Sequence, residues 1–225
     1  MKLTLHHAYQ SRSQRVLWLL YELGVEFELI QHNFFDKSLR SEDYLAISPA
    51  GRVPALEIDG EAMLESGAMV DYLCECFPAA GLGRAVGDPE RRLFLDLLHY
   101  AETIGQHCAN LTQSHLVLYE DWMRSPTQMG LEAKRLFVTL KRLDAMLSDG
   151  REFLLPTGFS GVDCAVAYGA VIGQKFTDIS GLAHLQAYLT RISNRPAFIK
   201  SWEKPKGVPA IYTKDFYEVP NVEKD

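Results

Sequence analysis

The sequence lacks three features that mark whole classes of protein. No apolar run reaches the length of a membrane span, and the first residues turn polar too soon for a secretory leader. Basic residues are not in excess, because 29 acidic side chains against 23 basic ones give a formal net charge of −6. Nucleic acids and anionic membranes both favour basic surfaces. We therefore expect a cytoplasmic protein whose partners include neither nucleic acid nor membrane.

Cysteine is also scarce. The four cysteines are scattered. A single residue separates Cys74 from Cys76, so the two do not form the CxxC pair of a redox or zinc motif. His6 and His7 do not suggest a metal either, because no third ligand is evident beside them. We expect reduced thiols and no metal site.

The first 78 residues alternate short strand and helix patterns. The predicted elements are, in order, a strand over 2–5, a polar turn over 6–10, a helix over 11–24, a strand over 25–30, a polar loop over 33–40, a short helix over 41–47, a hairpin and a helix over 68–77. Ser11 and Gln14 fit a capping box at the start of the first helix, and Gly24 fits its end. This order predicts a small mixed sheet with helices packed on it.

The strand patterns stop after Pro78. A glycine-rich linker is predicted over 79–88, an all-helical domain over 89–204 and an extended tail over 205–225. Helices are predicted over 90–111, 129–147, 161–174, 182–192 and 196–202. The third of these is opened by Ser160 and Asp163 as a capping box and is nearly uncharged, which is typical of a buried helix.

One stretch of the first domain joins a hairpin to the start of a helix. Asp59-Gly60 between two short apolar runs is a strong hairpin signal, and Pro54 begins the first run, where a strand tolerates proline. Glu65 and Ser66 stand at the start of the next helix. Its free N–H groups suit a carboxylate, and the Glu65 carboxylate suits an ammonium. Together they predict a site for an amino-acid head group.

Val53-Pro54 lies twelve positions before Glu65-Ser66, and with this domain order the chain resembles a glutathione S-transferase. Other segments that resemble the family are His6-His7, residues 11–20, residues 22–27, Leu98-His99-Tyr100-Ala101-Glu102 and Arg195-Pro196-Ala197-Phe198. The likeness is greatest to the serine type related to the theta and delta classes, and to bacterial and fungal members of the type first described in yeast. It covers about residues 2–204, and the tail after Lys204 does not obviously fit.

The resemblance implies a thioredoxin-like, glutathione-binding domain (βαβαββα) over 1–78, followed by an all-α helical bundle domain. It implies a cis bond before Pro54 that leaves the Val53 backbone free to pair with the cysteinyl part of glutathione. Ser66 would anchor the γ-glutamyl carboxylate and Glu65 would face its ammonium. Arg52 would reach the glycyl carboxylate, and Arg40 is a second candidate for that contact. An ordinary trans proline, a plain helix cap and a surface arginine are the structural alternatives.

The group that contacts the sulfur is less well defined by the sequence. A free thiol has a pKa of about 8.5, so a transferase must stabilise the thiolate. Ser11, four residues before Arg15, matches the serine of the theta- and delta-like members and is the first candidate. Its capping role explains the residue without catalysis, and Tyr9 and Ser13 are rivals.

The predicted function is addition of the glutathione thiolate to a small hydrophobic electrophile, a reaction that serves detoxification. We expect a cytoplasmic homodimer that uses glutathione as cosubstrate and needs no cofactor. Candidates for the electrophile pocket, which are mostly aromatic, are Tyr9, Tyr100, Ile104 and His107. A glutathione-dependent peroxidase or disulfide reductase on the same fold is one alternative. A non-catalytic glutathione-binding or regulatory protein is another.

Overall fold

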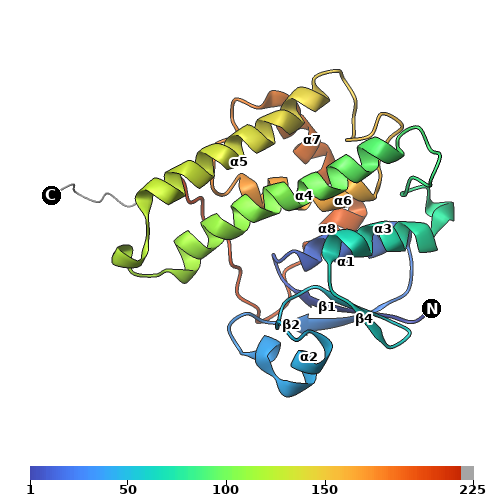
Figure 1. Ribbon diagram of the computed structural model, residues 1–225, viewed down its shortest axis with the longest axis horizontal. Helices are drawn as coiled ribbons and strands as arrows, with labels where there is room; N and C mark the ends of the chain where they lie inside the picture. Colours follow the sequence, from blue (N-terminus) through green and yellow to red (C-terminus); the bar gives the residue numbers. More distant parts are fainter. Residues whose placement is uncertain (219–225) are drawn as a thin grey trace.

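The computed structural model describes residues 1–218, and it contains one four-stranded sheet (Figure 1). The strands are β1 (Leu3–Ala8), β2 (Glu28–His32), β3 (Ala55–Ile58) and β4 (Glu61–Met63), in the order β2-β1-β3-β4. β1 is parallel to β2 and antiparallel to β3, and β4 returns antiparallel to β3. The mixed sheet confirms the arrangement predicted from the element order.

Helices cover both faces of this sheet. α1 (Ser13–Leu23) and α3 (Ser66–Cys76) lie on the face turned toward the rest of the molecule, and α2 (Glu42–Ile47) lies on the opposite face (Figure 1). Because side chains alternate along a strand, the adjacent His6 and His7 of β1 point to opposite faces, and both are buried. The thioredoxin-like first domain is confirmed.

The second half of the described chain is helical. Its main helices are α4 (Arg91–Thr112), α5 (Pro126–Leu147), α6 (Gly161–Gly173), α7 (Ala183–Ser193) and α8 (Pro196–Ser201). The nearly uncharged α6 is the central one, and all but one of its residues are buried. It packs so closely on α4 that a Cβ on Gly169 would lie 2.8 Å from Ile104 Cγ2. One hydrophobic core therefore runs from the sheet into the helical half.

Several local predictions are confirmed. Gly24 ends α1 in the left-handed conformation, with φ of 65°. The hairpin turns at Asp59 and Gly60, whose φ values are 51° and 93°. The Val53-Pro54 peptide bond is cis.

Three predictions near the first helix are wrong. β1 extends through Ala8, so residues 6–8 are strand rather than turn, and β2 begins three residues later than expected, at Glu28. α1 begins at Ser13, and the predicted capping box with Ser11 does not form. The Gln14 amide instead donates to the Ser201 carbonyl of α8. The Gln14 side chain, which the sequence pattern places in a helix cap, therefore makes a contact between the two domains instead.

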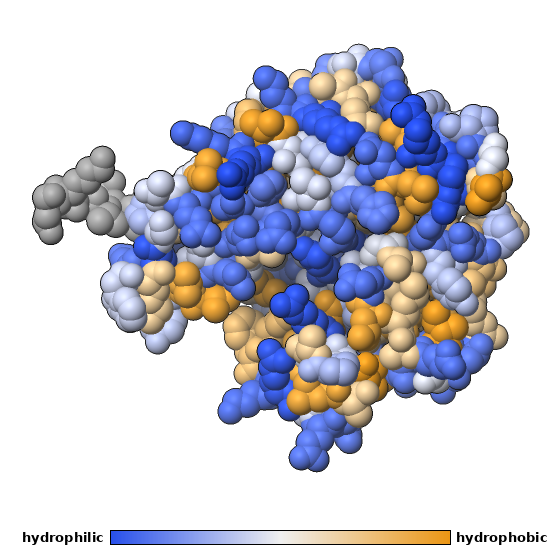
Figure 2. Space-filling model, in the orientation of Figure 1, coloured by the Kyte–Doolittle hydropathy of each residue, from blue (hydrophilic) through white to orange (hydrophobic). Residues whose placement is uncertain are grey.

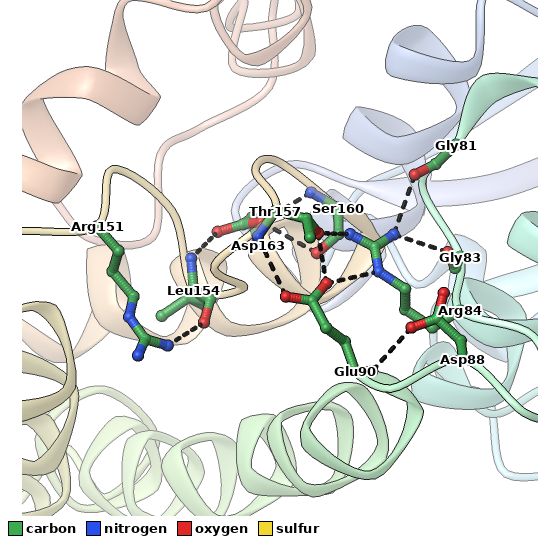
Figure 3. Close-up of polar contacts among 10 residues, drawn as sticks. All are labelled: Gly81, Gly83, Arg84, Asp88, Glu90, Arg151, Leu154, Thr157, Ser160 and Asp163. Carbon is green, nitrogen blue, oxygen red and sulfur yellow. Dashed lines mark hydrogen bonds and ion pairs between the residues drawn. The ribbon is translucent and has the colours of Figure 1, made fainter.

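The segment predicted as a linker is held in place by Arg84 (Figure 3). Its guanidinium donates to the Gly81 and Gly83 carbonyls at 3.1 and 2.7 Å, to Thr157 Oγ1 at 2.6 Å and to Glu90 Oε2 at 2.9 Å. The Thr157 N–H also donates to the Glu90 carboxylate. The connection between the two halves is therefore pinned to the start of α4 and to the loop before α6.

The predicted tail lies partly within the described residues, and positions 219–225 of it lie outside them. Gln10 Oε1 accepts from the backbone N–H groups of Ile211 and Tyr212 at 2.7 and 3.0 Å. The Tyr212 hydroxyl lies 2.9 Å from Thr112 Oγ1 of α4, and the Phe216 N–H donates to the Lys175 carbonyl. The tail therefore runs over the helical half and contacts the turn between β1 and α1.

Candidate functional site

A cluster of hydroxyl groups lies at the turn from β1 into α1. Gln10 adopts a left-handed conformation, with φ of 62°, and the Ser11 N–H donates back to the Ala8 carbonyl at 3.1 Å. This tight turn brings Ser11 Oγ to 2.6 Å from Ser13 Oγ and to 3.2 Å from the Ser13 N–H. Ser11 is 9% exposed, so its hydroxyl lies at the edge of the buried cluster.

His7 extends this cluster into the interior. Its Nδ1 lies 2.7 Å from Ser13 Oγ. Burial, and to a smaller extent the nearby His32, lower the pKa of His7 to about 4. The imidazole is therefore neutral near pH 7 and carries a single N–H.

The other face of the sheet supports the loop before β3. His32 packs on the Tyr44 ring, with 4.3 Å between centroids, and the Tyr44 hydroxyl donates to the Arg52 carbonyl at 2.6 Å. Ser48 Oγ donates to the same carbonyl at 3.0 Å. Two side chains thus fix the backbone that leads into Val53 and Pro54.

The start of α3 carries a buried cation beside its free N–H groups. Arg15 of α1 is inaccessible to solvent, and its guanidinium donates to Ser66 Oγ at 3.2 Å and to the Ala101 carbonyl at 3.0 Å. It also pairs with the Glu102 carboxylate of α4. Because Ser66 accepts from Arg15, its own hydroxyl proton is available to an incoming acceptor. Glu65 is exposed beside it and makes no capping hydrogen bond.

A second arginine, the residue just before α1, pairs with the same glutamate. Arg12 Nη1 donates to Glu102 Oε2 at 2.6 Å, and the Arg12 side chain is 35% exposed. A Cβ on Gly105 would lie 2.9 Å from Arg12 Nη2, so the glycine makes room for the guanidinium. Figure 2 shows hydrophilic side chains gathered in a hollow where the helical half meets the sheet-bearing half.

The predicted site residues divide into two groups. Ser11 lies just before α1, and Val53 and Pro54 lie just before β3, whose first residue pairs with His6 of β1. Glu65 and Ser66 lie at the start of α3, where Ser66 accepts from the buried Arg15. Arg52 is exposed at the edge of this group. Arg40 is turned away, because its guanidinium donates to the Ala50 carbonyl at 3.1 Å.

The predicted electrophile-pocket residues are mostly directed elsewhere, and we correct that part of the prediction. The Tyr100 hydroxyl donates to the Thr139 carbonyl of α5, and His107 Nδ1 lies 2.8 Å from the Glu132 carboxylate, also on α5. Both residues face α5 because their positions on α4 lie opposite those that contact α1. Ile104 is fully buried against α6.

Tyr9 is also turned away from the hydroxyl cluster. It packs edge-on against Trp202, with 6.5 Å between ring centroids, and lines a cavity of about 620 Å³ with residues of α6, α7 and α8. Ser11 and Ser13 are thus the hydroxyl candidates that the structure brings together. Within residues 1–218 no group of three metal-ligating side chains occurs, and no helix there has both the length and the apolar character of a membrane span.

Four polar residues of the site are not predicted from the sequence: Arg12, Arg15, Glu102 and His7. The two arginines fall in a helical pattern whose polar residues look solvent-facing, and the sequence gives no sign that α4 covers them. Charged side chains are rarely buried unless an opposite charge pairs with them. The partner of Arg15 is Glu102, which lies 87 positions away in the sequence.

Comparison with known proteins gives one family match and several similar proteins. The model for the glutathione S-transferase N-terminal domain matches residues 5–81. Glutathione S-transferase GstA of Escherichia coli O157:H7 is 26% identical over 183 residues, which cover 79% of this chain and 86% of that protein. The glutathione S-transferase of Antechinus stuartii is 26% identical and covers 93% of each chain.

Solved structures show the same architecture. A sphingomonad glutathione S-transferase complexed with glutathione superposes with a TM-score of 0.75 at 26% identity, over 89% of this chain and 97% of that one. A glutathione transferase of Phanerochaete chrysosporium with oxidized glutathione gives a TM-score of 0.80 at 19% identity, over 90% and 94% of the two chains. The second likeness concerns the fold alone.

Proposed function

The chain belongs to the glutathione S-transferase family, and we propose that it lowers the pKa of the glutathione thiol and adds the thiolate to a small hydrophobic electrophile. The observation that carries the proposal is that one segment serves both groups: the Ser11 hydroxyl lies just before α1, and Arg15, about one turn further on, contacts the anion site at the start of α3. The first suits a thiolate and the second suits the γ-glutamyl carboxylate.

The anion site is supported by charge and by hydrogen-bonding capacity. A helix start offers unpaired N–H groups and the positive end of the helix dipole. The buried Arg15 adds a full positive charge next to Ser66, and the Ser66 proton is free to donate. Glu65 supplies an exposed carboxylate for the ammonium of the same head group. Both charges of a zwitterionic end therefore have a partner within two adjacent residues.

The peptide part of the ligand has a backbone to pair with. Between residues 1 and 218, no residue hydrogen-bonds to the Val53 backbone, which lies just before β3. An extended peptide can bind such a backbone as an added strand. Arg52, exposed next to it, is in reach of a terminal carboxylate.

Chemistry through a protein thiol, as a disulfide reductase with its own cysteine would need, has little support. Burial raises the pKa of Cys74 and of Cys108 to about 12, and it raises that of Cys164 as well. A thiol with so high a pKa is a poor nucleophile at neutral pH. The fourth cysteine, Cys76, is the last residue of α3 and lies at the opposite end of that helix from Ser66. We therefore place the reacting sulfur on glutathione, with Ser11 as the donor that stabilises its thiolate.

The proposal is tested first by calorimetric titration with glutathione. We expect the wild type to bind, and Glu65→Ala/Ser66→Ala to bind at least tenfold more weakly. Glu61→Ala, which removes an exposed carboxylate from the neighbouring strand, is the matched control and should bind as the wild type does. Failure of the wild type to bind would refute the proposal, and equal binding by the double variant would show that the anchor lies elsewhere.

The reaction type needs a second measurement. We expect turnover of an activated aryl halide to exceed that of a hydroperoxide or a mixed disulfide. The reverse order would favour the peroxidase or reductase alternative. A protein that binds glutathione and turns over none of the three substrates would fit the non-catalytic alternative.

The proposal also includes a cytoplasmic homodimer, an expectation that comes from the family. Light scattering of the purified chain tests it directly, since each chain has a mass of 25.4 kDa. A mass of one chain at the concentrations used for the assays would refute the dimer.

A further inference from the structure

We propose that Ser13 and His7 are positioning residues that turn the Ser11 hydroxyl outward, toward the thiol of glutathione. This inference rests on the role of Ser11 in the proposed function. The three side chains form a continuous chain, with 2.6 Å between Ser11 Oγ and Ser13 Oγ and 2.7 Å between Ser13 Oγ and His7 Nδ1. Ser13 and His7 are 0% and 2% exposed, so neither meets the ligand itself.

The direction of one hydrogen bond decides what Ser11 can do. A hydroxyl has one proton and two lone pairs. Ser11 Oγ already lies 3.2 Å from the Ser13 N–H, which fills one lone pair. If Ser13 O–H donates to it as well, both lone pairs are used and the Ser11 proton is left for an external acceptor. If Ser11 donates to Ser13 instead, that proton is no longer available to a thiolate.

His7 sets this direction through Ser13. Ser13 Oγ accepts from the Ala8 N–H at 3.2 Å. If His7 Nδ1 carries the ring proton, it fills the second lone pair of Ser13, and the Ser13 proton must be donated onward. The nearer acceptor is Ser11 Oγ at 2.6 Å, against 3.3 Å for the Ala8 carbonyl, which already accepts from the Ser11 N–H. If Nδ1 carries no proton, both hydrogen bonds reverse: Ser13 donates to His7, and Ser11 donates to Ser13.

The surroundings of His7 favour the tautomer with the proton on Nδ1. Among residues 1–218, His7 hydrogen-bonds through Nδ1 alone, so a proton on Nε2 would have no protein acceptor. Burial keeps the ring neutral near pH 7, and His32, on the opposite face of the sheet, has a smaller effect in the same direction. A neutral ring has one proton to place, and Ser13 offers it the acceptor.

The test compares pH profiles of kcat/KM for an activated aryl halide at saturating glutathione. We expect Ser13→Ala to raise the apparent thiol pKa by about one unit and to lower kcat/KM near neutral pH by about tenfold. His7→Leu should act in the same direction. His7→Asn, whose side-chain N–H can replace Nδ1–H, should restore most of that loss. Each variant should bind glutathione as the wild type does, because Ser66 and Arg15 are untouched.

A double variant shows whether Ser13 acts through Ser11. If it does, Ser11→Ala/Ser13→Ala should be no more impaired than Ser11→Ala alone, because there is no hydroxyl left to orient. Additive losses would overturn the proposal. If Ser13→Ala does not fold, the comparison of His7→Leu with His7→Asn decides, and equal impairment of the two would overturn it.

Failure of this inference is distinguishable from failure of the proposed function. If Ser11→Ala raises the thiol pKa while Ser13→Ala and His7→Leu leave it unchanged, the positioning role is refuted and the transferase proposal stands. If Ser11→Ala also leaves the thiol pKa unchanged, the role of Ser11 is wrong, and the positioning role falls with it.

Discussion

The buried polar network around Asp163 and the network of the candidate site differ in how completely their hydrogen-bonding groups are paired. Around Asp163, at the start of α6, no buried side-chain polar atom of the described residues lacks a partner. Its carboxylate accepts from the Leu154 N–H and from the Ser160 N–H and hydroxyl, at 2.8 to 3.2 Å (Figure 3). The Tyr188 hydroxyl also donates to it, at 3.0 Å. The site network around Ser11 and Ser66 is instead incomplete among residues 1–218: the buried Arg15 Nε beside Ser66 has no hydrogen-bond partner, and the orientation proposed for Ser11 leaves its proton for a ligand.

The difference indicates what each network is for. A buried polar group without a partner costs free energy, so a network that serves only the fold is complete. A network that serves a ligand is complete only when the ligand is bound. The Asp163 network is also local, since three of its residues lie within ten positions of each other. The site network joins α1, α3 and α4, so it depends on how the two halves of the molecule pack.

Breaking the complete network should have the largest effect on stability. We expect Asp163→Ala to lower the free energy of unfolding by about 3–5 kcal/mol, because it leaves two backbone N–H groups and a tyrosine hydroxyl buried without an acceptor. Asp178→Ala is the matched control. Asp178 is an exposed aspartate that accepts from Ser180, and its loss should cost about 1 kcal/mol or less. Urea denaturation measures both, and equal losses would contradict the comparison.

The two networks should respond to acid in opposite ways. Burial lowers the pKa of His7 to about 4 from 6.5, so the unfolded chain binds more protons between these values and acidification weakens the fold. Burial raises the pKa of Asp163 to about 6 from 3.8, so the folded chain binds more protons in that window and acidification strengthens the fold. The first term is on the order of 3 kcal/mol.

His7→Leu isolates the histidine term. The stability of the wild type relative to this variant should be greatest above pH 6.5 and should fall as the pH approaches 4. Denaturation curves at a series of pH values measure this difference. A difference that does not change with pH would show that His7 is not buried as the neutral ring in the folded protein.

A smaller effect is expected where the site network meets the ligand. Arg15→Lys keeps the charge but loses the fork that reaches Ser66, Ala101 and Glu102 together. We expect glutathione to bind about tenfold more weakly, or about 1.4 kcal/mol. Arg142→Lys is the control, because Arg142 pairs with Asp96 on the surface and should not affect binding. Unchanged affinity in Arg15→Lys would remove Arg15 from the anion site.

The same contrast explains how much of the molecule the sequence predicts. The Ser160–Asp163 box, the Asp59-Gly60 hairpin and the Gly24 stop follow from side chains a few positions apart, and all are confirmed. Hydrophobic periodicity also locates α4, α5 and α7 in the second half, because their buried faces repeat at the helical period.

What the sequence does not predict is set by contacts between distant segments. Gln14 fits a helix cap by its local pattern, but its side chain donates to α8. Tyr100 and His107 face α5 rather than the first domain. These outcomes depend on which side of a helix meets which neighbour. No local pattern in one sequence carries that information.

The smallest effect is expected where the tail meets the site. Gln10, the residue before Ser11, joins the two. Its side chain accepts from the backbone N–H groups of Ile211 and Tyr212 in the tail. Its carbonyl accepts from the Tyr168 hydroxyl of α6. Gln10→Ala should lower the free energy of unfolding by about 1 kcal/mol, the net worth of such hydrogen bonds. It should leave the Kd for glutathione unchanged, since the anion site is untouched. Urea denaturation and calorimetric titration check the two expectations, and weaker glutathione binding would show that the tail also supports the anion site.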